Sequence, residues 1–164
     1  HPDPVALATV PDIRWARRDI KTTNLLGQVM AKQAAHLAGA YEALMIAPDG
    51  DITEAGSSSF FFIKDRKLYV RPVSNDILHG ITRQTMLRVA EQHQLQIVET
   101  TYTLEQALAA DEAFITAASI YVMPIGRIDD TVIGGGRTGP ITAALRQSYL
   151  ELARAEFPAP AGGR

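Results

Sequence analysis

A lysine at the start of a long apolar helix is the first residue of this chain whose position suggests chemistry. Lys21 lies between a segment expected to be short and extended, Ile13 to Ile20, and the apolar run that begins at Leu25. At such a junction the amine can point into a pocket, where desolvation and nearby cations favour its neutral, nucleophilic form. The alternative is an ordinary solvated lysine, because most lysines are exposed.

One further stretch has the composition of an anion site, and two others carry polar side chains next to predicted strands. Gly80-Ile81-Thr82 opens a predicted helix, and the unpaired N–H groups and positive dipole at a helix start stabilise an anion such as a phosphate. Glycine allows close backbone approach and Thr82 adds a hydroxyl, although that hydroxyl can also serve only as a helix cap. Thr116-Ala117-Ala118-Ser119 follows a predicted buried strand. A carboxylate, Glu54, ends another extended segment just before a run of serines.

Length and composition predict one globular domain. The chain has 164 residues, of which 46% are hydrophobic and 21% charged. Its net charge of −2 argues against a nucleic-acid partner, and no apolar run approaches the roughly 20 residues of a membrane span. The chain has no cysteine, which excludes disulfides and thiolate chemistry and fits a cytoplasmic protein. The four histidines lack metal-ligand spacing, so no metal site is predicted.

Hydrophobic periodicity predicts helices and strands in mixed order. Helices are expected at residues 25–40, 82–93, 104–110 and 140–157, and strands at 41–47, 52–54, 60–63, 68–71, 96–101, 112–117 and 121–128. Because strands and helices do not alternate strictly, an α+β fold with a mixed sheet is favoured over a doubly wound one. The first residues, His1 to Pro11, contain three prolines and are interpreted as a linker. Residues 158–164 are expected to be a disordered tail.

Four stretches together resemble the large domain of the fold-type IV pyridoxal-phosphate enzymes, and most of all the D-amino acid (D-alanine) transaminases. Each stretch alone is weak, but four in the same order and at similar separations are specific. The similarity covers about Ile13 to Phe157, and the stretches are Arg14 to Leu26, Glu54 to Ser59, Gly80 to Arg83 and Thr116 to Ser119.

The resemblance implies an α+β domain with a barrel-like mixed sheet flanked by helices, and pyridoxal 5'-phosphate as cofactor. It also implies a smaller N-terminal domain, which is absent from this chain. Residues 1–12 would then be the remnant of an interdomain linker, and residues 13–157 the cofactor-binding large domain.

The resemblance also implies a role for each matched residue. Lys21 corresponds to the lysine that forms a Schiff base with the cofactor and later moves a proton between the substrate Cα and the cofactor C4′. Glu54 corresponds to the glutamate that faces the pyridine nitrogen and keeps it protonated. The phosphate would be held by Arg14 and the helix start, and Leu78 would pack near the ring. The complete set of expected cofactor-binding residues is Lys21, Glu54, Arg14, Ser57, Ser58, Leu78, Gly80, Ile81, Thr82, Ala117 and Ala118.

The chain departs from the family pattern at two places. Ala118 stands where a phosphate-binding threonine is usual, which removes one hydroxyl, although the N–H groups of Ala117 and Ala118 could still bind the phosphate and Ser119 could substitute. Ala55 and Ser59 stand where glycine and asparagine are more usual.

The implied reaction is transamination between an amino acid and a 2-oxo acid. Leu26 favours D-amino acids such as D-alanine, because branched-chain transaminases commonly carry tyrosine there. Branched-chain L-amino acid transaminase, (R)-amine transaminase and aminodeoxychorismate lyase stay open, since all would share Lys21 and Glu54. Another alternative is an inactive cofactor-domain fragment that dimerises, which the missing domain and Ala118 favour. Family members are usually homodimers, so a homodimer is expected.

Overall fold

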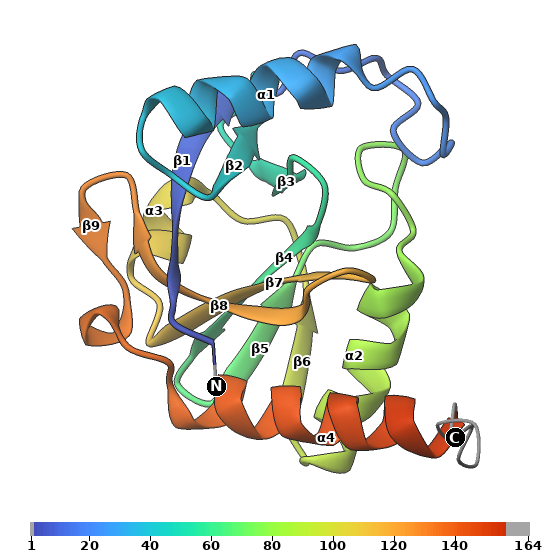
Figure 1. Ribbon diagram of the computed structural model, residues 1–164, viewed down its shortest axis with the longest axis vertical. Helices are drawn as coiled ribbons and strands as arrows, with labels where there is room; N and C mark the ends of the chain where they lie inside the picture. Colours follow the sequence, from blue (N-terminus) through green and yellow to red (C-terminus); the bar gives the residue numbers. More distant parts are fainter. Residues whose placement is uncertain (1, 157–164) are drawn as a thin grey trace, which may run out of the picture.

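The apolar runs of the sequence form strands that all join one mixed sheet. The computed structural model describes residues 2–156 (Figure 1). Its elements are β1 (Val5–Pro11), α1 (Leu26–Leu37), β2 (Glu42–Ile46), β3 (Ile52–Ala55), β4 (Ser59–Lys64), β5 (Lys67–Val70), α2 (Ile81–Gln92), β6 (Gln96–Glu99), α3 (Leu104–Leu108), β7 (Glu112–Ala117), β8 (Tyr121–Ile128), β9 (Thr131–Val132), a 3-10 turn (Gly134–Gly136) and α4 (Pro140–Glu156). The four helices and seven strands expected from the sequence are all present, with shifts of a few residues at their ends.

The nine-stranded sheet has the order β3-β2-β1-β8-β7-β4-β5-β6, with β9 paired to β8. β1 is parallel to both of its neighbours and β5 is parallel to β6, whereas the other pairs are antiparallel. Leu7 from β1, Phe60 from β4 and Ile125 from β8 belong to one buried cluster, so the sheet curls around it. The predicted α+β fold with a barrel-like mixed sheet is confirmed.

The start of the chain was expected to be a linker, but most of it forms a strand. Val5–Pro11 form β1, which lies between β2 and β8 near the middle of the sheet. Prolines flank this strand but do not interrupt its ladder, since Pro4 precedes it and Pro11 is its last residue. The extended segment expected at Ile13 to Ile20 is also wrong, because those residues form bends and a turn without a strand. The expected tail, residues 158–164, lies outside the described residues.

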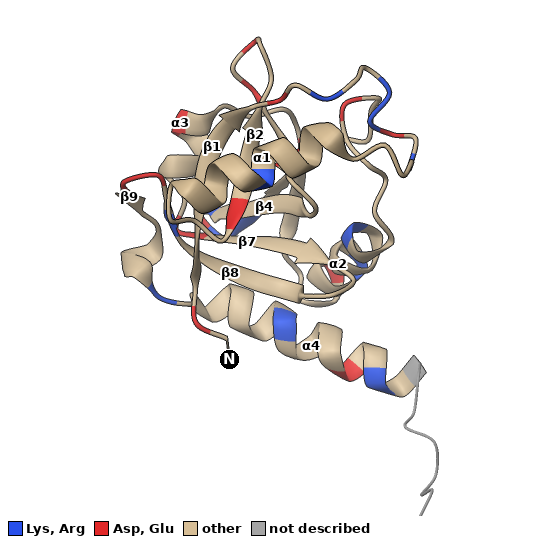
Figure 2. Ribbon diagram, turned by 45° about the horizontal axis from the view of Figure 1, so that its top comes forward, with Lys and Arg blue, Asp and Glu red and all other residues tan. Residues whose placement is uncertain are grey.

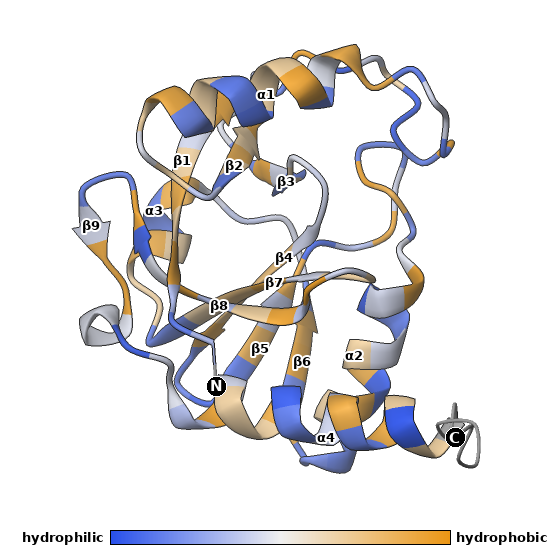
Figure 3. Ribbon diagram, viewed as in Figure 1, coloured by the Kyte–Doolittle hydropathy of each residue, from blue (hydrophilic) through white to orange (hydrophobic). Residues whose placement is uncertain are grey.

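Helices cover the outside of the curled sheet in two places. α1 packs on β1 and β2, where Ala31 and Ala35 meet Val10 and Met45. α2 and α4 pack on the other half, and Met86 and Leu145 meet apolar side chains of the strands there. Figure 3 shows the hydrophobic colours that run along these strands. No helix within the described residues is long and apolar enough to cross a membrane.

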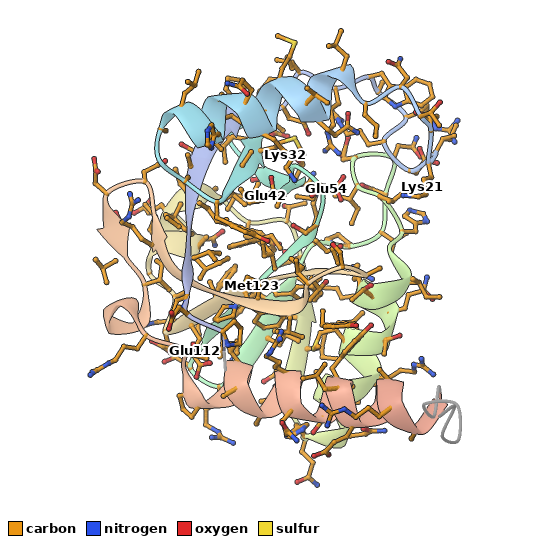
Figure 4. All side chains as sticks on the ribbon, viewed as in Figure 1. Lys21, Lys32, Glu42, Glu54, Glu112 and Met123 are labelled. Carbon is orange, nitrogen blue, oxygen red and sulfur yellow. The ribbon has the colours of Figure 1, made fainter. Side chains whose placement is uncertain are left out.

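A buried carboxylate from the sheet caps α4. Glu112 accepts hydrogen bonds from the backbone N–H of Ile141 at 3.1 Å and of Thr142 at 2.7 Å, and it lies beside the start of α4 (Figure 4). These two N–H groups have no partner inside the helix, and a negative charge complements the helix dipole there. Gly139 leaves the room this contact needs, because a Cβ at that position would lie 2.0 Å from Glu112 Cδ.

Glu112→Ala is expected to lower the free energy of unfolding by about 1–3 kcal/mol, because it leaves two helix-end donors without their charged acceptor. Urea unfolding measures the change. Glu91→Ala on α2 is the matched control: its side chain is exposed, and a surface substitution of this kind changes stability by at most about 0.5 kcal/mol. Equal losses in the two variants would contradict the capping role.

Candidate functional site

The site is centred on the buried carboxylate of Glu54 near the end of β3. Its side chain is only 8% exposed, and Oε1 lies 2.5 Å from Nη1 of Arg14. Both of its oxygens also accept from the backbone N–H of Leu78, at 3.3 Å each. Burial raises the pKa of Glu54 above its ordinary value, and the Arg14 guanidinium and the Leu78 N–H offset only part of that rise. The arrangement holds one carboxylate in a fixed position with a high affinity for a proton.

Arg14, which was expected to hold the phosphate, contacts two carboxylates. Its Nε and Nη2 donate to the two oxygens of Asp12 at 2.9 and 2.8 Å, and its Nη1 donates to Glu54. The side chain is 4% exposed. Asp12 and Glu54 together therefore take one donor from each of the three guanidinium nitrogens, and Arg14 orients the acid.

The start of α2 has backbone donors without capping acceptors among the described residues. Gly80 is the N-cap residue and makes no side-chain cap, so the first N–H groups of α2 have no capping acceptor among the described residues. Thr82 is buried, whereas Ile81 is 76% exposed. A Cβ on Gly80 would lie 3.5 Å from Oγ of Ser59, so the start of β4 lies against this helix end.

Two buried hydroxyls near this helix start lack hydrogen-bond partners. Thr116 of β7 is paired with Ser59 of β4, and the Oγ atoms of Thr116 and Ser58 have no partner among the described residues. Ala117 is half-buried at the end of β7, and Ala118 is exposed in the turn that follows. Thr116 was not among the expected binding residues. A buried hydroxyl without a hydrogen bond destabilises the fold unless a ligand or a water supplies the missing partner.

Ser57 lies apart from this group. Its Oγ donates to Oε2 of Glu42 at 2.8 Å and accepts from Nζ of Lys32 at 3.0 Å. These contacts fix the serine turn to α1 and β2, and Figure 4 labels Lys32 and Glu42 beneath α1. Ser57 was expected to contact the cofactor, and its hydroxyl here belongs to a cluster with Glu42 and Lys32.

Lys21 is exposed, contrary to the expectation that its amine points into a pocket. Figure 4 shows it on the loop before α1, outward from Glu54. The loop itself is held in place, because the N–H of Arg18 donates to the carbonyl of Asn75 at 2.9 Å and Nη1 of Arg18 pairs with Asp76 at 2.8 Å. Figure 2 shows the mixed charges of this loop. The lysine segment therefore lies against the loop that leads to Leu78 and α2.

As the pH rises from about 4 to about 7, the free energy of unfolding of Glu54→Gln is expected to increase relative to that of the unchanged chain. A carboxyl whose pKa is raised on folding binds protons more tightly in the native state, so its ionisation opposes folding above the ordinary value of 4.5. Glutamine has no such ionisation. Urea unfolding at several pH values in this window measures the difference, and a difference that stays constant would contradict the raised pKa.

The arrangement of donors and acids fits pyridoxal 5'-phosphate. A fixed buried carboxylate, an uncapped helix start and two unpaired buried hydroxyls occur on neighbouring segments. The acid suits a pyridine nitrogen and the helix start suits a phosphate. Ser57 and Arg14 have other partners, so Glu54, Leu78, Gly80, Ile81, Thr82, Ser58, Thr116, Ala117 and Ala118 are the residues available near the site.

The chain matches known proteins over most of its length. Residues 3–128 match the family model described as amino-transferase class IV. The D-alanine aminotransferase of Bacillus licheniformis is 43% identical over 150 residues, which cover 89% of this chain and 53% of that protein. The D-alanine aminotransferase of Staphylococcus epidermidis is 45% identical over 142 residues, covering 86% and 50%. The chain spans about half the length of the curated relatives it matches.

Solved structures show the same fold. The branched-chain amino acid aminotransferase of Thermobaculum terrenum in its PLP form superposes with a TM-score of 0.84 at 27% identity, covering 93% of this chain and 52% of that one. The branched-chain amino acid aminotransferase of Escherichia coli superposes with a TM-score of 0.85 at 25% identity, covering 96% and 54%.

Proposed function

The chain belongs to the class IV aminotransferase family, and we propose that it supplies the pyridoxal 5'-phosphate-binding part of an enzyme that moves an amino group between an amino acid and a 2-oxo acid. The observation that carries this proposal is the contact between Leu78 and Glu54. The N–H of Leu78 bonds both oxygens of the buried acid, and α2 begins three residues later at Ile81. One short segment thus links a ring-nitrogen acid to a phosphate-binding helix start.

Each residue of the proposed site would have a defined task. When bound, pyridoxal 5'-phosphate supplies a ring that accepts electrons from the substrate Cα. Glu54 would hold a proton at the pyridine nitrogen. The first N–H groups of α2, with Thr82, would bind the phosphate, and the backbone at Ala117 and Ala118 would add donors. Lys21 would hold the cofactor covalently and then carry a proton to or from the substrate Cα.

D-amino acids, D-alanine in particular, are the proposed substrates. Curated relatives at 43% and 45% identity are D-alanine aminotransferases, and Leu26 also favours this choice. Branched-chain L-amino acids are the second candidate, because the solved structures with this fold include branched-chain amino acid aminotransferases.

Amino-group transfer tests the proposal directly. The chain is incubated with pyridoxal 5'-phosphate and 2-oxoglutarate together with D-alanine, L-valine or (R)-1-phenylethylamine, and chiral chromatography follows the products. The same assay is run on the chain joined to the upstream domain of a D-alanine aminotransferase. We expect D-glutamate from D-alanine in at least the joined protein. Transfer only from L-valine would move the assignment to the branched-chain class, and no transfer in either protein would contradict the proposal.

A homodimer in the cytoplasm is also part of this proposal. α1 exposes a row of apolar side chains on the side away from the sheet, with Leu26 at 67%, Val29 at 58% and Met30 at 52% exposure. An apolar patch of this kind supports association with a second copy. Sedimentation velocity over a range of concentrations measures the state, and a monomer at every concentration would contradict the dimer.

A further inference from the structure

A second buried carboxylate lies behind the proposed acid. Asp12 follows β1, and its side chain is completely buried. It accepts from Oγ1 of Thr53 at 2.7 Å and from Nε and Nη2 of Arg14 at 2.9 and 2.8 Å. The backbone N–H of Arg14 donates to it as well, at 3.1 Å. Burial alone would raise the pKa of Asp12, but these hydrogen bonds outweigh it and the pKa lies below the ordinary value.

The planar guanidinium of Arg14 connects Asp12 to Glu54, so the position of Asp12 determines where Arg14 meets Glu54. A guanidinium presents its donors in a rigid fork. Because Asp12 takes Nε and Nη2 together, the direction of the remaining Nη1 is set, and it meets Glu54 at 2.5 Å. α1 confines the same side chain, since a Cβ on Gly27 would lie 3.0 Å from Cγ of Arg14. Arg14 has no room for a different arrangement without losing one of its carboxylates.

Asp12 also holds the segment that carries Lys21. Nε of Arg18 lies 3.3 Å from Asp12, while Nη1 of the same side chain pairs with Asp76. The contact of Arg18 with Asp12 is an ion pair without a hydrogen bond, whereas Arg14 is hydrogen-bonded to the same carboxylate. The lysine segment therefore has two residues beside Asp12, one of them hydrogen-bonded to it. Lys21 follows only three residues after the second contact.

We propose that Asp12 is a positioning residue of the site: it holds Arg14 against Glu54 and fastens the segment that carries Lys21. This inference rests on the proposed function. Asp12 lies behind Arg14 as seen from Glu54 and would act through the two arginines. The other charged side chains near Glu54 are Arg71 and Arg83, which line a small cavity together with it; both have acceptors of their own in Ile52 and Glu99.

Asp12→Asn separates positioning from simple charge. If Asp12 acted on Glu54 only through its negative charge, removing that charge would lower the pKa of Glu54. If Asp12 positions Arg14, the amide releases the guanidinium and the pKa of Glu54 rises by about one unit or more. ¹³C NMR of the side-chain carboxyl carbons follows this titration in the chain without cofactor, and the Glu54 signal is identified by its loss in Glu54→Gln.

The second readout is cofactor fixation. After incubation with pyridoxal 5'-phosphate and borohydride reduction, the fraction of Lys21 modified is expected to fall about tenfold in Asp12→Asn. The matched control, Asp130→Asn, changes an exposed aspartate in the turn after β8 and is expected to match the unchanged chain in both readouts. An unchanged or lowered pKa of Glu54 in Asp12→Asn would overturn the inference.

Thr53→Val keeps the inference testable if Asp12→Asn does not fold. It removes no charge, only the hydrogen bonds of the Thr53 hydroxyl to Asp12 at 2.7 Å and to the carbonyl of Met45 at 3.2 Å. A smaller rise in the pKa of Glu54 is expected, and no rise would overturn the inference. Failure of the proposed function is distinguishable, because the unchanged chain would then show no adduct on Lys21 although the NMR titration still reports on Asp12.

Discussion

Lys21→Ala is expected to abolish covalent cofactor attachment and to lower the rate of amino-group transfer by at least roughly 10²- to 10⁴-fold, the usual contribution of a general acid–base group. Lys32, the next lysine along the chain, does not replace it, because its amine is paired with Glu42 beneath α1. Stability should change little, since Lys21 is exposed and makes no ion pair among the described residues. Single-turnover transfer and thermal unfolding measure the two effects.

Two matched variants complete this test. Lys21→Arg keeps the positive charge but cannot form the covalent bond, so it should be as inactive as Lys21→Ala. Lys67→Ala removes a lysine at the start of β5 and should leave transfer unchanged. Residual transfer in Lys21→Ala close to that of the unchanged chain would remove Lys21 from the proposed chemistry.

Arg14→Met is expected to lower the free energy of unfolding by about 3–5 kcal/mol at neutral pH, because it leaves the carboxylates of Asp12 and Glu54 buried without their shared cation. Methionine keeps much of the apolar stem, so the loss reports mainly on charge and hydrogen bonds. Urea unfolding gives the value, and Arg137→Ala, at an exposed arginine, is the control with little change expected.

Acid should reduce the cost of Arg14→Met. The pKa of Asp12 is lowered in the folded chain, so the stability that this carboxylate contributes is present above its ordinary value of 3.8 and is lost as the pH falls through the lowered pKa. The loss caused by the variant should therefore shrink below about pH 4. A cost that stays the same from neutral to acidic pH would contradict the ion pairs as its source.

The helices and the predicted strands were foreseeable because their hydrophobic periods are regular. β1 was missed because prolines at its two ends suggested a linker. The residues between them, Val5 to Val10, form a mostly apolar run bounded by turn signals. This is also the pattern of a buried strand that pairs in parallel with its neighbours. That pattern could have identified the strand, and with it the buried position of Asp12 that follows.

The partners of Arg14 could not be predicted from sequence spacing. Asp12 is two residues away and Glu54 is forty, and they meet only because β1 and β3 lie on either side of β2. The acid and the helix start were found because each has a local sequence signal. The orphan hydroxyl of Thr116 had no such signal, since a threonine in a β-strand is ordinary.

The most direct test of the account is to identify the residue that binds the cofactor. The chain, alone and joined to an upstream domain, is incubated with pyridoxal 5'-phosphate, reduced with borohydride, digested and examined by mass spectrometry. We expect a visible absorbance band before reduction and one phosphopyridoxyl group on Lys21 after it. No adduct in either protein, or an adduct spread over exposed lysines with none favoured at Lys21, would contradict it.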